Sequence, residues 1–322
     1  MKIAVMTSGG DAPGMNAAVR AITRGALSKG WEVFGVRNGY AGLLADALDP
    51  LQAREVGGII QHGGTVLGSA RSPEFAQPPG RAQALKNLRA RGIEALVVIG
   101  GNGSQTGNHT LHKEGLRVVG VPSTIDNDLY GTDISIGSDT AINITLEAID
   151  RLRTTASSHQ RAFAVETMGR DCGYIALIAG LAGGAEVIAL PESEISPEEV
   201  AERMRAAHRR GKKHALIVIA EGARCGVQEL MSHYEKERAS IGFDLRVTRL
   251  GHVVRGGAPS AADRVLATRL GAAAIDALER GESGVLVGMN CNAISTTPLG
   301  EIAGRTRPAD GRLLELARTM AI

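Results

Sequence analysis

Aromatic residues and cysteines are scarce in this sequence. Aromatic side chains make up only 3% of the 322 residues, although apolar residues make up 43%, so a core has to be built from Val, Ile, Leu and Ala. The three cysteines are far apart and show no C-x-x-C spacing: Cys172, Cys225 and Cys291. This pattern indicates neither a disulfide framework nor a zinc site.

The sequence also lacks long apolar runs and a surplus of either charge. No run approaches the ~18–20 apolar residues of a membrane-spanning helix. The first apolar run reaches Ser8-Gly9-Gly10 so early that it leaves no room for a signal peptide. Lys and Arg number 36 and Asp and Glu 34, and this net charge of +2 argues against a general nucleic-acid-binding protein. We expect a cytoplasmic protein that binds neither nucleic acid nor membrane.

Glycine, in contrast, is abundant, at 42 residues, roughly twice the usual ~7%. Short apolar runs alternate with amphipathic helical patterns, which predicts an α/β fold with doubly wound, mainly parallel sheets. The strands are apolar nearly throughout, so both faces of each sheet should be covered. The first strands are expected at residues 2–7, 31–37, 95–99 and 117–121, and the first helices at 15–29 and 81–91.

The pattern restarts near residue 139 and predicts a second lobe. A capping box, Ser196-Pro197-Glu198-Glu199, marks the start of one of its helices. The other elements expected are helices 140–154, 174–182 and 259–280, a closing helix from Asp310, and strands 161–167, 186–190, 214–220, 245–250 and 284–289. We expect one lobe of residues 1–138 plus 255–305 and another of residues 139–254 plus 306–322.

Glycine-rich turns follow two of the expected strands, at residues 7–16 and 100–107. Open α/β sheets bind ligands beyond the carboxyl ends of their strands, and glycines before a helix start expose backbone N–H groups to an anion. Two such turns indicate a ligand with more than one phosphate, or two phosphorylated ligands. An ordinary tight turn is the alternative for each. The first turn lacks G-x-G-x-x-G, which argues against a dehydrogenase.

A third turn carries two carboxylates in the run Thr124-Ile125-Asp126-Asn127-Asp128. Carboxylates at the end of a buried strand suit a metal or a hydroxyl, and a hydroxyl that attacks phosphorus needs a carboxylate to accept its proton. The alternative is an Asx turn that caps a helix.

Arginines and one histidine near the strand ends are candidates for binding phosphate, which Arg contacts bidentately. Surface solubility is the alternative for each Arg, and His252 has no partner at zinc-ligand spacing. The candidates are Arg71, Arg161, Arg170, Arg246, His252 and Arg255.

Taken in order, these motifs resemble the bacterial ATP-dependent 6-phosphofructokinase family over almost the whole chain. The matching stretches are residues 7–16, 63–75, 100–104, 124–128, 158–161, 168–170, 211–213 and 251–257. The resemblance implies a phosphofructokinase-like fold whose first lobe binds nucleotide and whose second binds sugar phosphate and effector. It implies transfer of the γ-phosphoryl group of ATP to the 1-hydroxyl of fructose 6-phosphate in glycolysis, with Mg2+ as cofactor.

The resemblance also implies roles for single residues. Asp126 would be the base, with Thr124 and Asp128 beside it, and Arg170, Arg71 and Gly10 would hold the transferring phosphoryl group. Implied ATP contacts are Gly10, Tyr40, Arg71, Ser72, Arg81, Gly101, Asn102, Gly103, Ser104 and Gly107. Implied substrate contacts are Thr124, Ile125, Asp126, Asp128, Arg161, Met168, Gly169, Arg170, Glu221, Arg246, His252, Val253, Val254 and Arg255. Arg161 and Arg246 would reach a neighbouring subunit, which implies a homotetramer.

Two positions bear on the phosphoryl donor. Pyrophosphate-dependent relatives carry Asp at the position of Gly103 and Lys at that of Ser123, so the two small residues here favour ATP. Asn102 stands where ATP-dependent relatives have an Asp associated with Mg2+. Asn keeps a neutral oxygen but removes a negative charge from the site of a hard cation. We therefore expect a correct fold with weakened catalysis or a raised metal requirement.

The family's ADP or phosphoenolpyruvate effector site is matched only in part. Ala53 and Gly58 stand where relatives often have Arg and Asp. The matching residues are Arg20, Arg24, Arg54, Arg153, Gly184, Glu186, Arg210, Lys212 and Lys213. Two alternatives to the ATP-dependent kinase stay open: a pyrophosphate-dependent enzyme, and a non-catalytic or regulatory subunit that binds sugar phosphate.

Overall fold

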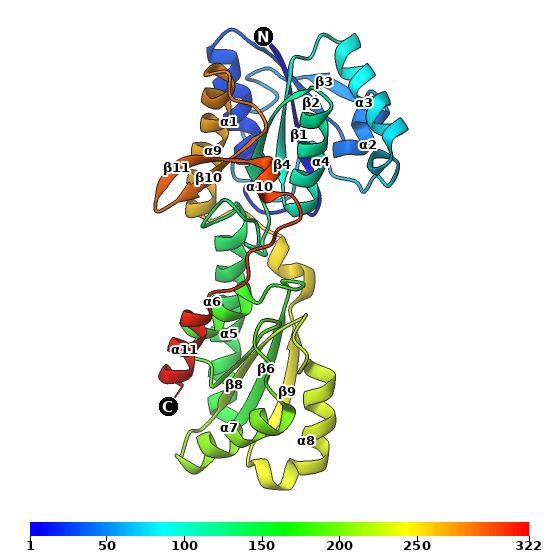
Figure 1. The fold of residues 1–322 in the computed structure, drawn as a ribbon. Helices are drawn as coiled ribbons and strands as arrows, with labels where there is room; N and C mark the ends of the chain where they lie inside the picture. Colours follow the sequence, from blue (N-terminus) through cyan, green and yellow to red (C-terminus); the bar gives the residue numbers. More distant parts are fainter. Residues whose placement is uncertain (322) are drawn as a thin grey trace. The chain divides into compact units, whose positions relative to one another are not determined.

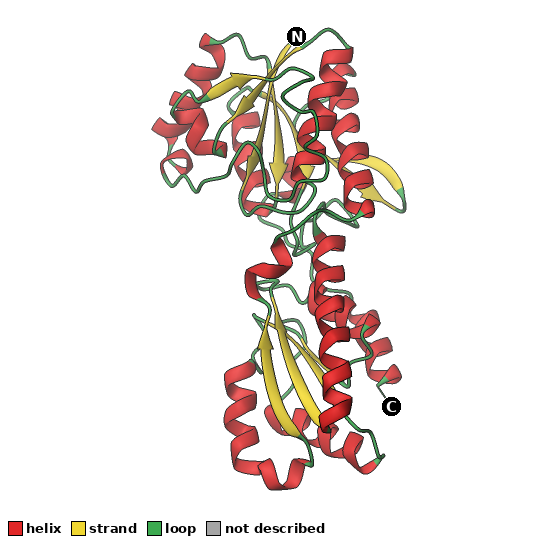
Figure 2. Ribbon diagram, turned by 180° about the vertical axis from the view of Figure 1, so that it is seen from behind, coloured by secondary structure: helices red, strands yellow, loops and turns green. Residues whose placement is uncertain are grey.

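The computed structural model describes residues 1–321, which divide into two units (Figures 1 and 2). Unit 1 comprises Met1–Asp139 and Arg255–Thr306, and unit 2 comprises Thr140–Val254 and the residues from Arg307 on. Each unit has its own sheet and is described by itself.

Unit 1 is built on a seven-stranded sheet in the order β11-β10-β5-β4-β1-β2-β3. The strands β2, β1, β4, β5 and β10 run parallel, and β3 and β11 pair antiparallel at the two edges. Strand β10 pairs with β5, so a late segment of the chain completes this sheet. The strands are β1 (Lys2–Ser8), β2 (Glu32–Val36), β3 (Leu48–Pro50), β4 (Ala95–Gly100), β5 (Arg117–Pro122), β10 (Val285–Asn290) and β11 (Ala293–Pro298).

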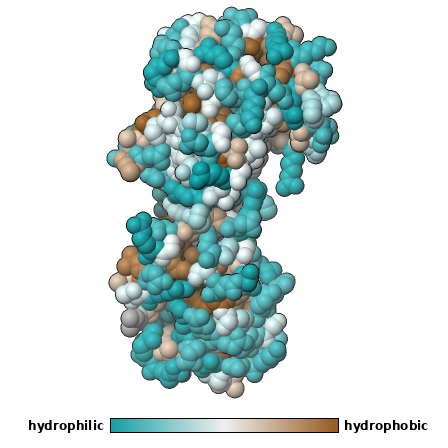
Figure 3. All heavy atoms as spheres, in the orientation of Figure 1, coloured by the Kyte–Doolittle hydropathy of each residue, from teal (hydrophilic) through white to brown (hydrophobic). Residues whose placement is uncertain are grey.

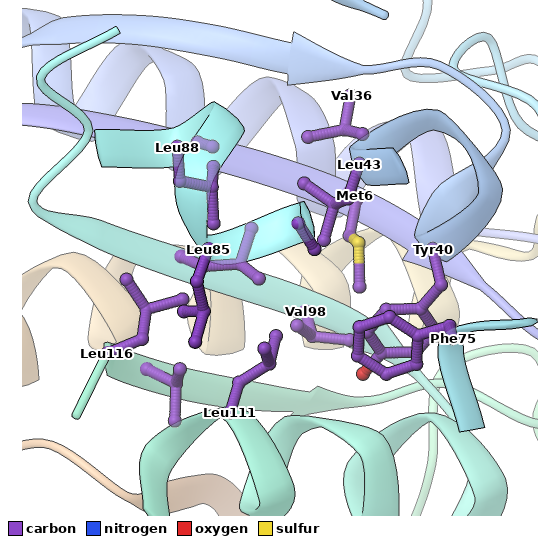
Figure 4. Close-up of a cluster of buried hydrophobic side chains, with 14 of the residues drawn as sticks. Met6, Val36, Tyr40, Leu43, Phe75, Leu85, Leu88, Val98, Leu111 and Leu116 are labelled. Carbon is purple, nitrogen blue, oxygen red and sulfur yellow. The ribbon is translucent and has the colours of Figure 1, made fainter. Parts of the chain in front are cut away.

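Helices cover both faces of the unit 1 sheet (Figure 1). Met6 and Val98, which point to one face, join side chains of α2, α3 and α4 in a buried cluster (Figure 4). In this cluster the Tyr40 ring stacks on Phe75 at 4.0 Å between centroids. Helices α1 and α9 pack against each other and the sheet. The helices are α1 (Met15–Ser28), α2 (Gly39–Leu44), η1 (Glu74–Ala76), α3 (Pro78–Ala90), α4 (Asn102–Lys113), α9 (Ala261–Glu279) and α10 (Leu299–Ile302).

Unit 2 contains a four-stranded, fully parallel sheet in the order β7-β8-β6-β9. Its strands are β6 (Arg161–Thr167), β7 (Val187–Ala189), β8 (Ala215–Ala220) and β9 (Asp244–Arg249). The segment Gly251–Arg255 forms the 3-10 helix η2 after β9. The helices are α5 (Ser138–His159, whose first two residues belong to unit 1), α6 (Tyr174–Ala182), α7 (Pro197–Arg209), α8 (Val227–Ile241) and α11 (Gly311–Met320).

The predicted α/β fold with mainly parallel sheets is confirmed. The predicted start of α7 is confirmed too: Ser196 is its N-cap and its Oγ accepts a hydrogen bond from Glu199 N at 3.1 Å, with Pro197 as the first helical residue. The sequence analysis missed β3, β11 and the helices α2, α8 and α10. Strand β3 has three residues and ends in Pro50, and β11 is mostly exposed and polar, so neither shows the apolar run of a buried strand.

The strand order in the sheet of unit 1 reverses beside β1, because β2 and β3 follow on one side of β1 and β4 and β5 lie on the other. Ligands of open α/β sheets bind where strand order reverses in this way. On the face shown in Figure 3 most side chains are hydrophilic and the hydrophobic ones form separate areas. No helix in residues 1–321 is both long and apolar enough to cross a membrane.

Candidate active site

Three loops of unit 1 leave the sheet at the same level. The register of the strands pairs Ser8 with Gly100 and Gly100 with Pro122, the last residues of β1, β4 and β5. The loops stay in contact beyond the sheet. A Cβ atom on Gly9 would lie 3.1 Å from Ser104 Oγ, and one on Gly101 would lie 3.4 Å from Thr124 Cβ. The two glycine-rich turns and the carboxylate turn therefore form one surface.

Helices α1 and α4 both begin without a side-chain cap; α4 begins at this surface, whereas the first turn of α1 is buried. Their N-cap residues are Gly14 and Gly101, and neither helix has an acidic residue in its first turn. In contrast, α7, α9 and α11 are capped by Ser196, Ser260 and Asp310. An uncapped first turn at the surface, as in α4, leaves N–H donors and the positive end of the helix dipole available to an anion. The second glycine-rich turn thus has the chemistry of a phosphate site.

The turn that carries Asp126 is held by its neighbours in the loop. Asp126 N donates to Thr124 Oγ1 at 3.2 Å. Asn127 has a φ of 50°; its Nδ2 donates to Asp133 O at 3.0 Å and its Oδ1 accepts from Ser135 N at 2.8 Å. No helix starts in the described chain between this turn and Ser138, so the Asx turn does not cap a helix. The Asn127 side chain instead holds a turn in which Asp126 is buried, at 6% exposure.

Asn102 and Asp128 join the second and third loops. Asn102 Nδ2 donates to Asp128 Oδ2 at 2.8 Å. This contact fixes the orientation of the amide, because an ionised carboxylate only accepts hydrogen bonds. Asn102 Oδ1 is buried and has no hydrogen-bond partner among the described residues. A buried oxygen without a partner costs free energy, so this site is suited to a donor or a cation from a ligand.

The other residues expected at the nucleotide site differ in accessibility. Tyr40 is buried: its hydroxyl donates to Ser104 O at 2.6 Å and burial raises its pKa. The Tyr40 ring also lies against Gly107. Arg81 forms an ion pair with Glu114 at 2.6 Å. Tyr40 therefore packs behind the first turns of α4 and holds them through its hydroxyl. The Arg81 side chain is already engaged in an ion pair. Arg71 and Ser72 lie on the surface of the loop that precedes η1.

Arg255 lies directly over the first glycine-rich turn. A Cβ atom on Gly10 would collide with the Arg255 guanidinium, so glycine allows this close approach. Arg255 Nε is buried and has no hydrogen-bond partner in the described chain. Among its neighbours, Val254 is fully buried, whereas His252 and Val253 are exposed.

In unit 2 the corresponding loops also leave the sheet side by side, since Thr167 of β6 pairs with Ala220 of β8. Glu221 Oε1 accepts hydrogen bonds from Gly169 N at 3.2 Å and from Arg170 N at 2.9 Å. Arg170 has a φ of 51°, a conformation that costs free energy for a residue with a side chain. The Glu221 carboxylate holds this turn and leaves the Arg170 side chain exposed. Met168, in contrast, is buried.

Comparison with known proteins agrees with the motifs. A sequence model described as "Phosphofructokinase" matches residues 2–278. The chain belongs to the phosphofructokinase family. It is 53% identical over 322 residues to ATP-dependent 6-phosphofructokinase 1 of Thermus thermophilus, covering all of this chain and 99% of that protein. It is 48% identical over 321 residues to the ATP-dependent 6-phosphofructokinase of Bacillus subtilis (strain 168), with the same coverage. The structure of Pichia pastoris phosphofructokinase in the T-state matches with a TM-score of 0.89 and 38% identity, over 99% of this chain and 36% of that chain.

Within this member of the phosphofructokinase family, Arg161 and Arg246 share a carboxylate that the sequence analysis missed. Asp244 Oδ2 lies 2.7 Å from Arg246 Nη2 and 3.5 Å from Arg161 Nε. Arg161 and Asp244 start the paired strands β6 and β9, so the contact follows from the strand register. The sequence gives no signal for this role of Asp244. Arg161 is far from it along the chain, and a spacing of two residues to Arg246 on one strand is too common to indicate an ion pair.

The residues that match the family's effector site fall in both units. Arg20, Arg24 and Arg54 belong to unit 1 and the rest to unit 2. In unit 2 the buried Glu186 forms an ion pair with Lys212 at 3.1 Å, and Arg153 lies against Gly184. Glu186 and Arg210 also line one cavity of about 230 Å³. No group of three or more His, Cys, Asp or Glu side chains in residues 1–321 is placed to hold a metal.

The Asn127 contacts generate a stability prediction. Asn127→Ala removes three hydrogen bonds and leaves a left-handed residue, so we expect the free energy of unfolding to fall by about 2–4 kcal/mol. Asn127→Asp keeps the acceptor for Ser135 and should lose less. Denaturant unfolding measures both losses, and hydrogen exchange at residues 124–135 locates them. Equal stability of Asn127→Ala and the wild type would contradict the prediction.

Proposed function

We propose that Asp126 is the base in an ATP-dependent transfer of phosphoryl to fructose 6-phosphate. The chain catalyses this step of glycolysis, which gives fructose 1,6-bisphosphate and ADP. One observation carries the assignment of the base: Asp126 is buried in a turn that lies beside the uncapped start of α4. A carboxylate in this position accepts the proton of the 1-hydroxyl of the sugar while the hydroxyl oxygen attacks the γ-phosphorus of ATP.

Positive groups stabilise the transferring phosphoryl in this proposal. The backbone at Gly10, the Arg71 guanidinium and Arg170 act on the charge that spreads over its oxygens. Glu221 is a positioning residue in this step, because it holds the turn that presents Arg170. Asp128 and Thr124 fix the turn around the base. Met168, Gly169, His252, Val253, Val254 and Arg255 make up the sugar-phosphate side, and the buried Ile125 and Val254 contribute through their backbone.

The space around Gly103 supports ATP as donor. A Cβ atom on Gly103 would meet nothing within 4 Å, which leaves room for the α-phosphate of a nucleotide. Ser123 is buried and its hydroxyl donates to Ile136 O at 3.3 Å. The hydroxyl therefore points into the protein and takes no space from a nucleotide.

The residues present fit a divalent metal, and we propose Mg2+. The orphaned Asn102 Oδ1 is a neutral oxygen ligand of the kind that hard cations accept, and the Asp128 carboxylate lies next to it. Asn102 and Asp128 would hold a metal that arrives with the nucleotide phosphates. When bound, the metal would neutralise charge on the phosphoryl oxygens. The amide at position 102 supplies one negative charge fewer than Asp would, which supports weakened catalysis.

Assembly and regulation also belong to the proposal. We propose a homotetramer in which Arg161 and Arg246 bind the sugar phosphate in a neighbouring subunit, and an ADP or phosphoenolpyruvate site around Glu186, Lys212 and Arg210. The cavity that Glu186 and Arg210 share is also lined by Arg203 and Arg318, and this surplus of arginines over the one carboxylate supports an anionic effector. We place the reaction in the cytoplasm, where free cysteines such as the three here stay reduced.

The first prediction tests the base. Asp126→Asn should lower kcat by about a thousandfold or more, because a general base contributes 10²–10⁴-fold, while fructose 6-phosphate still binds. Initial rates with ATP and then pyrophosphate, over a range of Mg2+, measure the reaction and its donor. Activity with pyrophosphate alone would favour the pyrophosphate-dependent alternative. A wild-type protein that binds fructose 6-phosphate but turns over neither donor would be the non-catalytic subunit.

A second prediction concerns Asn102. Asn102→Asp should raise kcat at saturating Mg2+, by as much as about a hundredfold if the missing charge costs ~3 kcal/mol in the transition state. The new carboxylate would face Asp128 and replace a hydrogen bond by repulsion, so this variant should also unfold at a lower temperature in EDTA and recover in Mg2+. Asn102→Ser, which adds no charge, is the control. An unchanged or lower rate at saturating Mg2+ counts against the metal role of position 102.

A third prediction tests the shared site. Asp126→Asn and Arg246→Ala should each be nearly inactive as homotetramers. Co-expressed, they should regain a share of the wild-type activity, since some sites combine Asp126 of one subunit with Arg246 of another. Hybrid tetramers without recovered activity would show that Arg246 acts in its own subunit.

A further inference from the structure

The buried carboxamide of Asn16 in unit 1 holds an irregular segment, residues 62–69, by hydrogen bonds to its backbone. Asn16, the second residue of α1, is 1% exposed. Its Nδ2 donates to His62 O at 3.0 Å and to Gly63 O at 3.2 Å, and its Oδ1 accepts from Val66 N at 2.7 Å. One side chain thus satisfies three backbone groups that lie about 50 residues away along the chain.

Two hydroxyls fix the same segment further along. The fully buried Thr7 Oγ1 donates to Gly68 O at 2.9 Å and lies 2.7 Å from Thr65 Oγ1. Ser69 Oγ then donates to Gly9 O at 2.5 Å. Residues 62–69 form no helix or strand, so these side chains supply contacts that a ladder of backbone hydrogen bonds would otherwise give.

The fastened segment ends two residues before Arg71. Arg71 is exposed, and within residues 1–321 it forms no hydrogen bond or ion pair. Its position therefore depends on the backbone that leads to it. That backbone is tied to the first turn of α1 by Asn16 and to the Gly9–Gly10 turn by Ser69.

The same segment touches the loop after Arg255. A Cβ atom on Gly63 would collide with the Gly257 carbonyl, so the two backbones are in direct contact. Gly63 O is also one of the acceptors for Asn16 Nδ2. This backbone contact adds to the hydrogen bonds that hold residues 62–69 in place.

We propose that Asn16 is a positioning residue for phosphoryl transfer, which acts by holding residues 62–69 and so places the Arg71 guanidinium. The inference rests on the proposed role of Arg71. Mispositioning of a charged group by about 1 Å lowers a rate by about a hundredfold, so loss of the Asn16 contacts should act on kcat. It should change the KM for fructose 6-phosphate little, because no fructose 6-phosphate contact is assigned to Arg71.

A double-mutant cycle tests this with a matched control. The variants are Asn16→Ala, Arg71→Ala and the double variant. The control is Asn87→Ala, because Asn87 Nδ2 also donates to two consecutive carbonyls, Leu43 O at 2.8 Å and Leu44 O at 3.0 Å, in the same unit. Assays of kcat, of KM for both substrates and of thermal stability are run on the full-length enzyme.

We expect Asn16→Ala to lower kcat about a hundredfold and Asn87→Ala to keep the wild-type kcat at a comparable loss of stability. The double variant should be no slower than Arg71→Ala, because residues that act through one another are not additive. Thr7→Val removes the hydrogen bonds of Thr7 Oγ1 to residues 65 and 68 at nearly constant side-chain volume, so it should also lower kcat. It replaces Asn16→Ala as the test variant if Asn16→Ala does not fold.

Three results would overturn the inference: additive losses in the cycle, an equal loss of kcat in Asn87→Ala, or a Thr7→Val enzyme with wild-type kcat when Asn16→Ala does not fold. Failure of the proposed function is distinguishable from these. A wild-type protein without activity on ATP and fructose 6-phosphate removes both conclusions. An active wild type with an additive cycle removes only the role of Asn16.

Discussion

The parallel pairing of β1 with β4 is the constraint on which the site depends. Its register puts Ser8 beside Gly100, so the two glycine-rich turns leave the sheet together. Helix α4 begins at this surface without a side-chain cap, whereas the equally uncapped start of α1 is buried. The first turn of α4 therefore has N–H donors suited to a phosphate, of the kind that a serine side chain satisfies in α7 and α9.

Asparagine side chains hold much of the irregular backbone around this surface. Asn16 fixes the segment before Arg71, Asn127 fixes the turn of Asp126, and Asn102 ties Asp128 to α4. An amide both donates and accepts, so a single buried side chain can satisfy backbone groups of both kinds. Loops fastened in this way are rigid enough to place charged groups for phosphoryl transfer.

Local signals in the sequence predicted many of the elements. The capping box at Ser196, the glycine-rich turns after β1 and β4 and the apolar runs of the parallel strands all depend on residues close together in the chain. The edge strands were missed because β11 is exposed and polar. The sharing of Asp244 by Arg161 and Arg246 was missed because it needs the register of β6 and β9.

Residue types and short-range spacing are enough to predict the α/β alternation, the family and the chemical groups at each strand end. Which of these groups meet follows from the folded chain. The bond from Asn102 to Asp128 spans 26 residues and that from Asn16 to Val66 spans 50. Such contacts depend on strand order and register, which bring distant segments together and leave no periodic trace in either one.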